Sequence, residues 1–115
     1  IGGQARPVSS AKFGGSSHLS NLLLELRRFD SSTSVIINLR WDSIISDILE
    51  KLEIVSSKLE RDGESLSVNK RSTEAEALID EGGYGFEPSL YIIGKSHKRV
   101  CKIVEDLGQY IEAMA

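Results

Sequence analysis

Cysteines, histidines and long apolar runs are scarce in this chain, and each shortage excludes a class of protein. The 115 residues include one cysteine, Cys101, and two histidines. A single cysteine excludes an internal disulfide and is typical of a protein from a reducing cytoplasm. His18, His97 and Cys101 do not supply the ligands of a usual zinc site, so we predict no metal site and no zinc-dependent aldolase. No apolar run approaches the roughly 20 residues of a membrane span, and no signal-peptide pattern is present, so we expect no membrane partner.

Charge and length set further limits. The formal net charge of −3 disfavours direct binding of nucleic acid, which requires a basic surface. A length of 115 residues with 40% apolar and 27% charged residues predicts one globular domain over residues 1–115. Because the chain starts with Ile1 and not with methionine, we expect it to be a fragment of a longer protein.

Apolar periodicity predicts three helices. Leucines at helical spacing from Leu19 predict a helix of about ten residues after a loop that ends at His18. A second helix follows an N-cap at Asp42 or Ser43, and a third follows an N-cap at Ser96. The expected buried stripes are Leu19, Leu22, Leu23, Leu26 and Phe29; Ile44, Ile45, Ile48, Leu49 and Leu52; and Val100, Ile103, Val104, Leu107 and Ile111, with Cys101 as a small core residue beside the last stripe.

Short apolar runs predict the strands. The clearest are residues 35–39, which we expect to be buried on both faces of a sheet, and residues 89–93, which end at Gly94. Weaker signals cover residues 8–13, 54–59 and 77–79, the last with a helix from Glu74 as the alternative, and Leu66 and Val68 fit a short strand within a polar stretch that is hard to assign. Strands that alternate with helices predict an α/β sandwich.

One glycine-rich segment precedes the first helix and consists of Gly14, Gly15, Ser16, Ser17 and His18. Glycines let a backbone approach a ligand closely, and the first turn of a helix offers unpaired N–H groups and the positive end of a dipole. This pattern predicts a phosphate cradle, with an ordinary N-cap and turn as the alternative. His18 either contacts the ligand and moves a proton or only caps and packs.

A second glycine-rich segment covers residues 80–88 and predicts the other half of the same site. Its candidates are Asp80, Gly82, Gly83, Gly85 and Glu87, with the glycines required by backbone geometry. The two carboxylates would bind a ligand amine or a phosphate-linked magnesium ion.

Two further candidates lie in the first clear strand. Arg40 stands at the carboxyl end of the strand, where α/β sheets place ligands, and a guanidinium binds phosphate in a bidentate manner. The alternative for Arg40 is a surface ion pair with Asp42. Asn38 either orients a ligand heteroatom or satisfies neighbouring backbone groups.

These motifs, in this order, resemble the ThiN domain. The resemblance rests on residues 13–18 (FGGSSH), 38–41 (NLRW) and 80–88 (DEGGYGFEP), followed by Gly94, and it spans nearly the whole chain. It implies a three-layer α/β/α sandwich with a mixed sheet, similar to class II aldolases. It also implies the joining of hydroxymethylpyrimidine diphosphate to thiazole phosphate, which yields thiamine phosphate and pyrophosphate.

The resemblance leaves two functions open. ThiN domains follow a hydroxymethylpyrimidine phosphate kinase, as synthases, or a helix-turn-helix domain, as sensors of thiamine phosphate for transcription. Only 17 residues precede His18, and the stretch between Gly63 and Asp80 is shorter than is usual in the family, which favours binding over synthesis. We therefore expect a cytoplasmic, dimeric ligand-sensing domain, with a synthase as the alternative, in which magnesium assists and His18 and Arg40 are the catalytic candidates.

Overall fold

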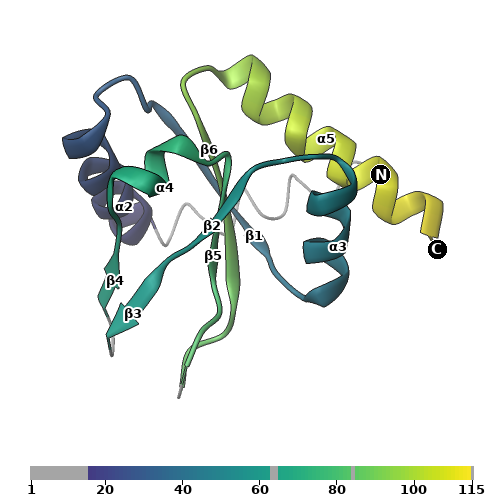
Figure 1. Ribbon diagram of the computed structural model, residues 1–115, viewed down its shortest axis with the longest axis horizontal. Coiled ribbons are helices and arrows are strands. Elements are labelled where there is room, and N and C mark those ends of the chain that lie inside the picture. Colours follow the sequence, from purple (N-terminus) through teal and green to yellow (C-terminus); the bar gives the residue numbers. More distant parts are fainter. Residues whose placement is uncertain (1–15, 63–64, 84, 115) are drawn as a thin grey trace.

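Four strands form one mixed sheet at the centre of the computed structural model, which describes residues 16–62, 65–83 and 85–114 (Figure 1). The strand order is β1-β6-β5-β2, where β1 is Val35–Arg40, β6 is Ser89–Gly94, β5 is Ala77–Asp80 and β2 is Ser56–Lys58. Strand β6 runs antiparallel to both β1 and β5, whereas β2 runs parallel to β5. A separate antiparallel hairpin pairs β3, Glu60–Asp62, with β4, Ser65–Ser67.

Helices cover both faces of the sheet, which confirms the prediction of an α/β fold with a mixed sheet (Figure 1). Helix α2, Ser16–Phe29, and the short helix α4, Lys70–Glu74, lie on one face, which we call the α2 face. Helix α3, Ser43–Lys51, and helix α5, His97–Met114, lie on the other, which we call the α3 face. None of these helices is long and apolar enough to cross a membrane, within the part of the chain that the structure describes.

Two apolar clusters hold these layers together. Successive residues of a strand point to opposite faces, so each strand contributes to both clusters. In β6, Leu90 and Ile92 join the α3-face cluster, while Tyr91 and Ile93 join the α2-face cluster. The buried members of the α3-face cluster are Val35, Ile48, Leu49, Ile54, Ala77, Ile79, Leu90, Ile92, Val100, Ile103 and Leu107.

Several local predictions are confirmed. Strands β5 and β6 occupy the runs that the sequence indicates. Asp42 is the N-cap of α3, because its carboxylate accepts a hydrogen bond of 2.9 Å from the Ile45 N–H. Ser96 caps α5 in the same manner, with its Oγ 3.2 Å from the Arg99 N–H.

Other local predictions are wrong, and each error has a tertiary cause. Strand β1 is not buried on both faces, because it lies at the edge of the sheet and only Val35 in it is buried. Phe29, Ile44 and Ile111 are 40%, 50% and 43% exposed, since the helix surfaces that carry them turn away from the sheet. Cys101 is exposed on α5 and is no core residue.

The polar connector contains two elements that the apolar pattern missed. The first is strand β3, which pairs with β4. The second is helix α4, which begins at a capping box: the Asn69 side chain accepts a hydrogen bond from the Ser72 N–H, and the Ser72 hydroxyl accepts one from the Asn69 N–H. Strand β2 is shorter than the predicted 54–59. Helix α2 starts at Ser16, earlier than predicted, and the predicted strand at 8–13 lies outside the described residues.

Candidate functional site

Polar side chains gather in two neighbouring rows across the α2 face of the sheet. The strand register aligns Asn38 of β1 with Tyr91 of β6, and it aligns Arg40 with Ser89 and Ser89 with Asp80. Residues opposite each other on antiparallel strands point to the same face, and rows two residues apart along a strand are separated by roughly 7 Å. Since Tyr91 belongs to the α2-face cluster, both rows lie on that face. We call these five residues and His18 the polar corner.

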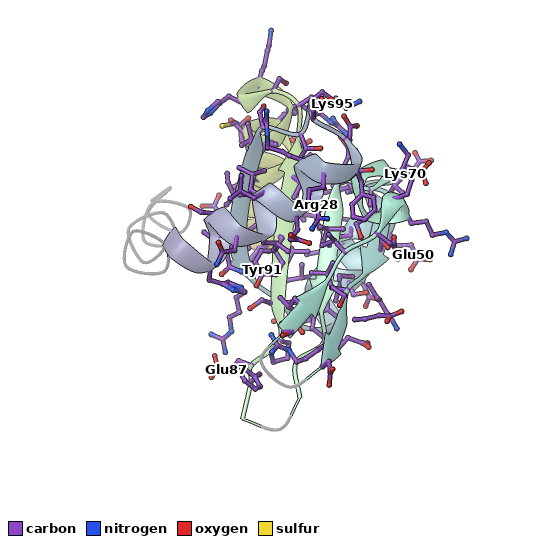
Figure 2. All side chains as sticks on the ribbon, turned by 90° about the vertical axis from the view of Figure 1, so that its left-hand side faces the viewer. Arg28, Glu50, Lys70, Glu87, Tyr91 and Lys95 are labelled. Atoms are coloured by element: carbon purple, nitrogen blue, oxygen red, sulfur yellow. The ribbon has the colours of Figure 1, made fainter. Side chains whose placement is uncertain are left out.

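The first turn of α2 reaches this corner through His18. Its Nε2 lies 3.0 Å from the Tyr91 hydroxyl, although the two residues are 73 positions apart. His18 is exposed, whereas Tyr91 is 2% exposed. Figure 2 shows Tyr91 beneath the first half of α2. The first turn of α2 therefore contacts the polar rows through His18, while Leu19 beside it packs against the α2-face cluster.

Tyr91 is held in its protonated form. Burial, together with the negative charge of Asp80, raises the pKa of Tyr91 above its usual value of 10.0. A protonated phenol both donates and accepts a hydrogen bond. Tyr91 can therefore form this hydrogen bond with either tautomer of the His18 imidazole, which holds the ring at the edge of the corner.

The two candidates on β1 have different surroundings. Asn38 is half-buried, and its Nδ2 lies 3.5 Å from the Leu90 carbonyl oxygen on the neighbouring strand, a long contact. Arg40 is exposed at the end of the strand, where its guanidinium is accessible from solvent. The sequence left an ion pair with Asp42 as the alternative role for Arg40. In the structure, the Asp42 carboxylate accepts a hydrogen bond from the Ile45 N–H as the cap of α3.

Asp80 is the buried charge of the corner, with 2% of its surface exposed. Its Oδ1 and Oδ2 accept from Arg61 Nε and Nη2 at 3.2 and 2.6 Å, and Oδ1 also accepts from the Gly82 N–H at 2.9 Å. Burial raises the pKa of Asp80, but the hydrogen bonds from Arg61 and Gly82 outweigh it and hold the pKa below its usual value of 3.8. Asp80 is therefore a carboxylate whose two oxygens already have protein donors.

The segment after β5 turns back on itself, and we call its described residues, 81–83 and 85–88, the glycine loop. Gly83 and Phe86 exchange two backbone hydrogen bonds of 3.1 and 3.0 Å. Gly82 has φ +78°, and a Cβ there would lie 2.5 Å from the Phe86 carbonyl oxygen, so this position requires glycine. Gly85 also has a positive φ, of +80°. The glycine-rich composition thus follows from a tight turn.

The structure brings some of the predicted residues together and leaves others apart. His18, Asn38, Arg40 and Asp80 share the α2 face, with Gly82 bonded to Asp80. Glu87 is exposed and lies beyond the end of the strands (Figure 2). The backbones of Ser16 and Ser17 form the start of α2, while Gly14 and Gly15 lie outside the described residues.

Three members of the site were not singled out from the sequence. Tyr91 and Ser89 flank an apolar residue in a strand, and their alternation with Leu90 indicated a polar row only once the neighbouring strands were known. Arg61 lies in a polar stretch with no pattern of its own, and only its contact with Asp80 identifies it.

Two other features of the described residues do not add to this corner. No group of three or more His, Cys, Asp or Glu side chains suitable for a metal ion occurs among residues 16–62, 65–83 and 85–114. A cavity of about 440 Å³ lies at the other end of the sheet, near the start of α5. Its charged lining includes two internal ion pairs, Arg99 with Glu76 at 2.6 Å and Lys95 with Asp30 at 3.4 Å.

The mixed sheet and its polar corner define an α/β domain with one chemically distinct end. The sequence profile described as thiamine-phosphate synthase ThiN matches residues 1–106. The chain therefore belongs to the ThiN family, and the resemblance drawn from the three sequence motifs is confirmed.

Individual relatives agree with this membership. The chain is 24% identical over 108 residues to the bifunctional thiamine biosynthesis protein ThiDN of Methanocaldococcus jannaschii. The match covers 85% of this chain but 26% of that protein, so the chain spans about a quarter of its relative.

Two solved structures share the fold. The C-terminal domain of protein MJ0236 matches with a TM-score of 0.68 and 21% identity over 85% of this chain and 60% of that one. The C-terminal domain of a phosphomethylpyrimidine kinase matches with a TM-score of 0.58 and 18% identity over 78% and 60%. This chain is thus a ThiN-related thiamine-biosynthesis domain.

Proposed function

We propose that this domain binds thiamine phosphate, or one of its phosphorylated precursors, at the polar corner. The observation that carries the proposal is the convergence of His18 and Arg40, two groups that can bind phosphate, on one face of the sheet beside the first turn of a helix. A helix start adds unpaired N–H groups and the positive end of its dipole to such a site. Membership of a thiamine-biosynthesis family supports this choice of ligand.

Each residue of the corner has a role in this proposal. Arg40 holds phosphate oxygens, which a planar guanidinium does with two parallel hydrogen bonds. His18, steadied by Tyr91, donates to the same phosphate from its exposed ring. Asn38 and Ser89 offer an amide and a hydroxyl to the heteroatoms of the ligand.

Asp80 takes a different part from the one that the sequence indicates. Because Arg61 and Gly82 already donate to both of its oxygens, we assign it to anchoring the glycine loop and not to a ligand amine or a magnesium ion. Glu87, which is exposed on that loop, remains a candidate for either partner.

We favour a ligand-sensing role, with the domain as the regulatory module of a longer, cytoplasmic, dimeric protein that carries a helix-turn-helix domain. Binding alone requires the residues of the corner and no further chemistry. The alternative is a thiamine-phosphate synthase fused to a hydroxymethylpyrimidine phosphate kinase. There Arg40, His18 and a magnesium ion would stabilise the leaving pyrophosphate electrostatically.

Calorimetric titration with thiamine phosphate tests the binding proposal. We expect Arg40→Ala and His18→Ala to weaken binding by about tenfold or more each, since each removes a charge-assisted contact. Arg28→Ala is the matched control, because Arg28 is exposed near the far end of α2 and pairs only loosely with Glu25, at 3.2 Å (Figure 2). Absence of heat with millimolar ligand and wild-type protein contradicts the proposal.

A second experiment separates sensor from synthase. The protein is incubated with both phosphorylated precursors and magnesium, and the mixture is analysed for thiamine phosphate. We expect none to form although the protein binds thiamine phosphate. Formation of product that Arg40→Ala abolishes favours the synthase.

A further inference from the structure

One arginine side chain contacts the glycine loop at two residues and also pairs with Asp80, which precedes the loop. Arg61 lies on β3, in the hairpin that pairs with no strand of the main sheet among the described residues. Its guanidinium forms the bidentate pair with Asp80, and only 13% of its side chain is exposed. The same guanidinium lies over the ring of Phe86, with its central carbon 4.3 Å from the ring centroid. A Cβ on Gly83 would lie 3.5 Å from Arg61 Cδ, so that glycine rests against the stem of the side chain.

These contacts connect both ends of the turn to the hairpin. Through Asp80, Arg61 reaches the Gly82 N–H at the start of the loop. Through Phe86, it reaches the residue that closes the turn by two backbone hydrogen bonds to Gly83. A planar guanidinium satisfies all of this at once, because its edge binds the carboxylate while its face stacks on the ring.

The hairpin itself is fixed to the body of the domain. Leu59, which precedes β3, is buried in the α2-face cluster, and Leu66 of β4 and Val68 pack against that cluster. The hairpin is therefore a rigid support, whereas the glycine loop is a turn that depends on its contacts. Because Arg61 connects the two, it sets where the loop lies relative to the polar corner.

We infer that Arg61 is a positioning residue for ligand binding, which acts through Asp80 and Phe86 and does not touch the ligand. This inference rests on the proposed function, since it assigns the glycine loop to the wall of the same site. A lysine at position 61 keeps the charge but loses both the bidentate fork and the stacking plane. The loop of Arg61→Lys therefore samples other positions, and ligands of every kind bind more weakly.

The test compares Arg61→Lys with Arg99→Lys in titrations with thiamine phosphate and with unphosphorylated thiamine. Arg99 also forms a bidentate pair, to Glu76 at 2.6 and 2.8 Å, at the other end of the sheet, so Arg99→Lys is the control for the arginine-to-lysine change itself. We expect Arg61→Lys to weaken the binding of both ligands by the same factor, of about five to tenfold. Arg99→Lys should leave both affinities unchanged. Equal losses of affinity in the two variants would overturn the inference. A loss of affinity confined to the phosphorylated ligand would also overturn it, because Arg61 would then contact the phosphate directly.

Amide hydrogen exchange in the ligand-free protein gives an independent readout. We expect the Gly82 and Phe86 amides to exchange at least about fivefold faster in Arg61→Lys, while Gly108 on α5 is unchanged. Unchanged loop exchange overturns the positioning role even where affinity falls. If the wild-type protein binds neither ligand, the proposed function fails, and exchange still decides whether Arg61 positions the loop.

Discussion

The two faces of the sheet are built by the same strands but differ in chemistry. On the α3 face, β6 presents Leu90 and Ile92 to helices α3 and α5, and every buried residue of that cluster is apolar. On the α2 face the same strand presents Tyr91 and Ser89, and the buried polar residues Thr33, Ser72 and Asp80 all lie on that side or beside α2 and α4. A face that only stabilises the fold needs no buried charge, because such a charge costs desolvation. Both faces therefore stabilise the fold through an apolar cluster, and the buried polar groups of the α2 face are the feature on which the proposed binding role rests.

The largest effect is expected on the α2 face, from Arg61→Ala. It leaves the Asp80 carboxylate, 2% exposed, without its partner, and breaking a buried ion pair in this way costs about 3–5 kcal/mol of the free energy of unfolding. Asp80→Ala should lower the free energy of unfolding by less, because the Arg61 left behind has 13% of its side chain exposed and reaches solvent more easily. Urea unfolding of both variants measures the difference. Equal costs would contradict the account of Asp80 as the buried member of the pair.

A somewhat smaller effect is expected on the α3 face, from Ile103→Ala. Ile103 is 1% exposed, so the truncation removes buried apolar surface and leaves a cavity, at a cost of about 2–4 kcal/mol of the free energy of unfolding. Since this face is remote from the polar corner, the affinity of the folded variant for thiamine phosphate should stay within about twofold of wild type. A larger loss of affinity would show that ligand binding is not confined to the α2 face.

Acid should destabilise the α2 face through Asp80. The pKa of Asp80 is lower in the folded than in the unfolded protein, so its contribution to stability is present above its ordinary pKa of 3.8 and is lost as the pH falls further towards the folded value. Asp80→Asn removes this contribution at neutral pH, and the gap in stability between wild type and variant should narrow below about pH 4. Urea unfolding at a series of pH values measures the gap. A gap that is constant from neutral pH to pH 3 would contradict the lowered pKa.

Much of the fold could be predicted from the sequence, because its signals are local. The β-branched runs at β1 and β6 and the helical spacing in α2, α3 and α5 depend on neighbours within a few residues along the chain. The N-caps at Asp42 and Ser96 were found for the same reason. In the connector only the short strand around Leu66 was indicated; β3 and α4 were missed, because a three-residue polar strand and a five-residue polar helix have no apolar pattern.

The candidate site was predicted in part. The sequence identified residues whose types suit a phosphate, among them His18, Asn38 and Arg40, and the strand register places the last two on the face to which His18 is bonded. It did not identify Tyr91, which reads as a core aromatic within an apolar strand, or Arg61, which reads as a solvated charge. Both acquire their roles from a partner on another element.

What the sequence by itself determined is therefore the order and type of the main elements and the family, since glycine turns, caps and apolar periodicity are properties of short stretches. Tertiary structure alone decided which side chains meet. The hydrogen bond between His18 and Tyr91 spans 73 positions, and that between Arg61 and Asp80 spans 19. Contacts of this kind depend on strand order and on the face that each residue occupies, and both are set by how the elements bury their apolar surfaces together.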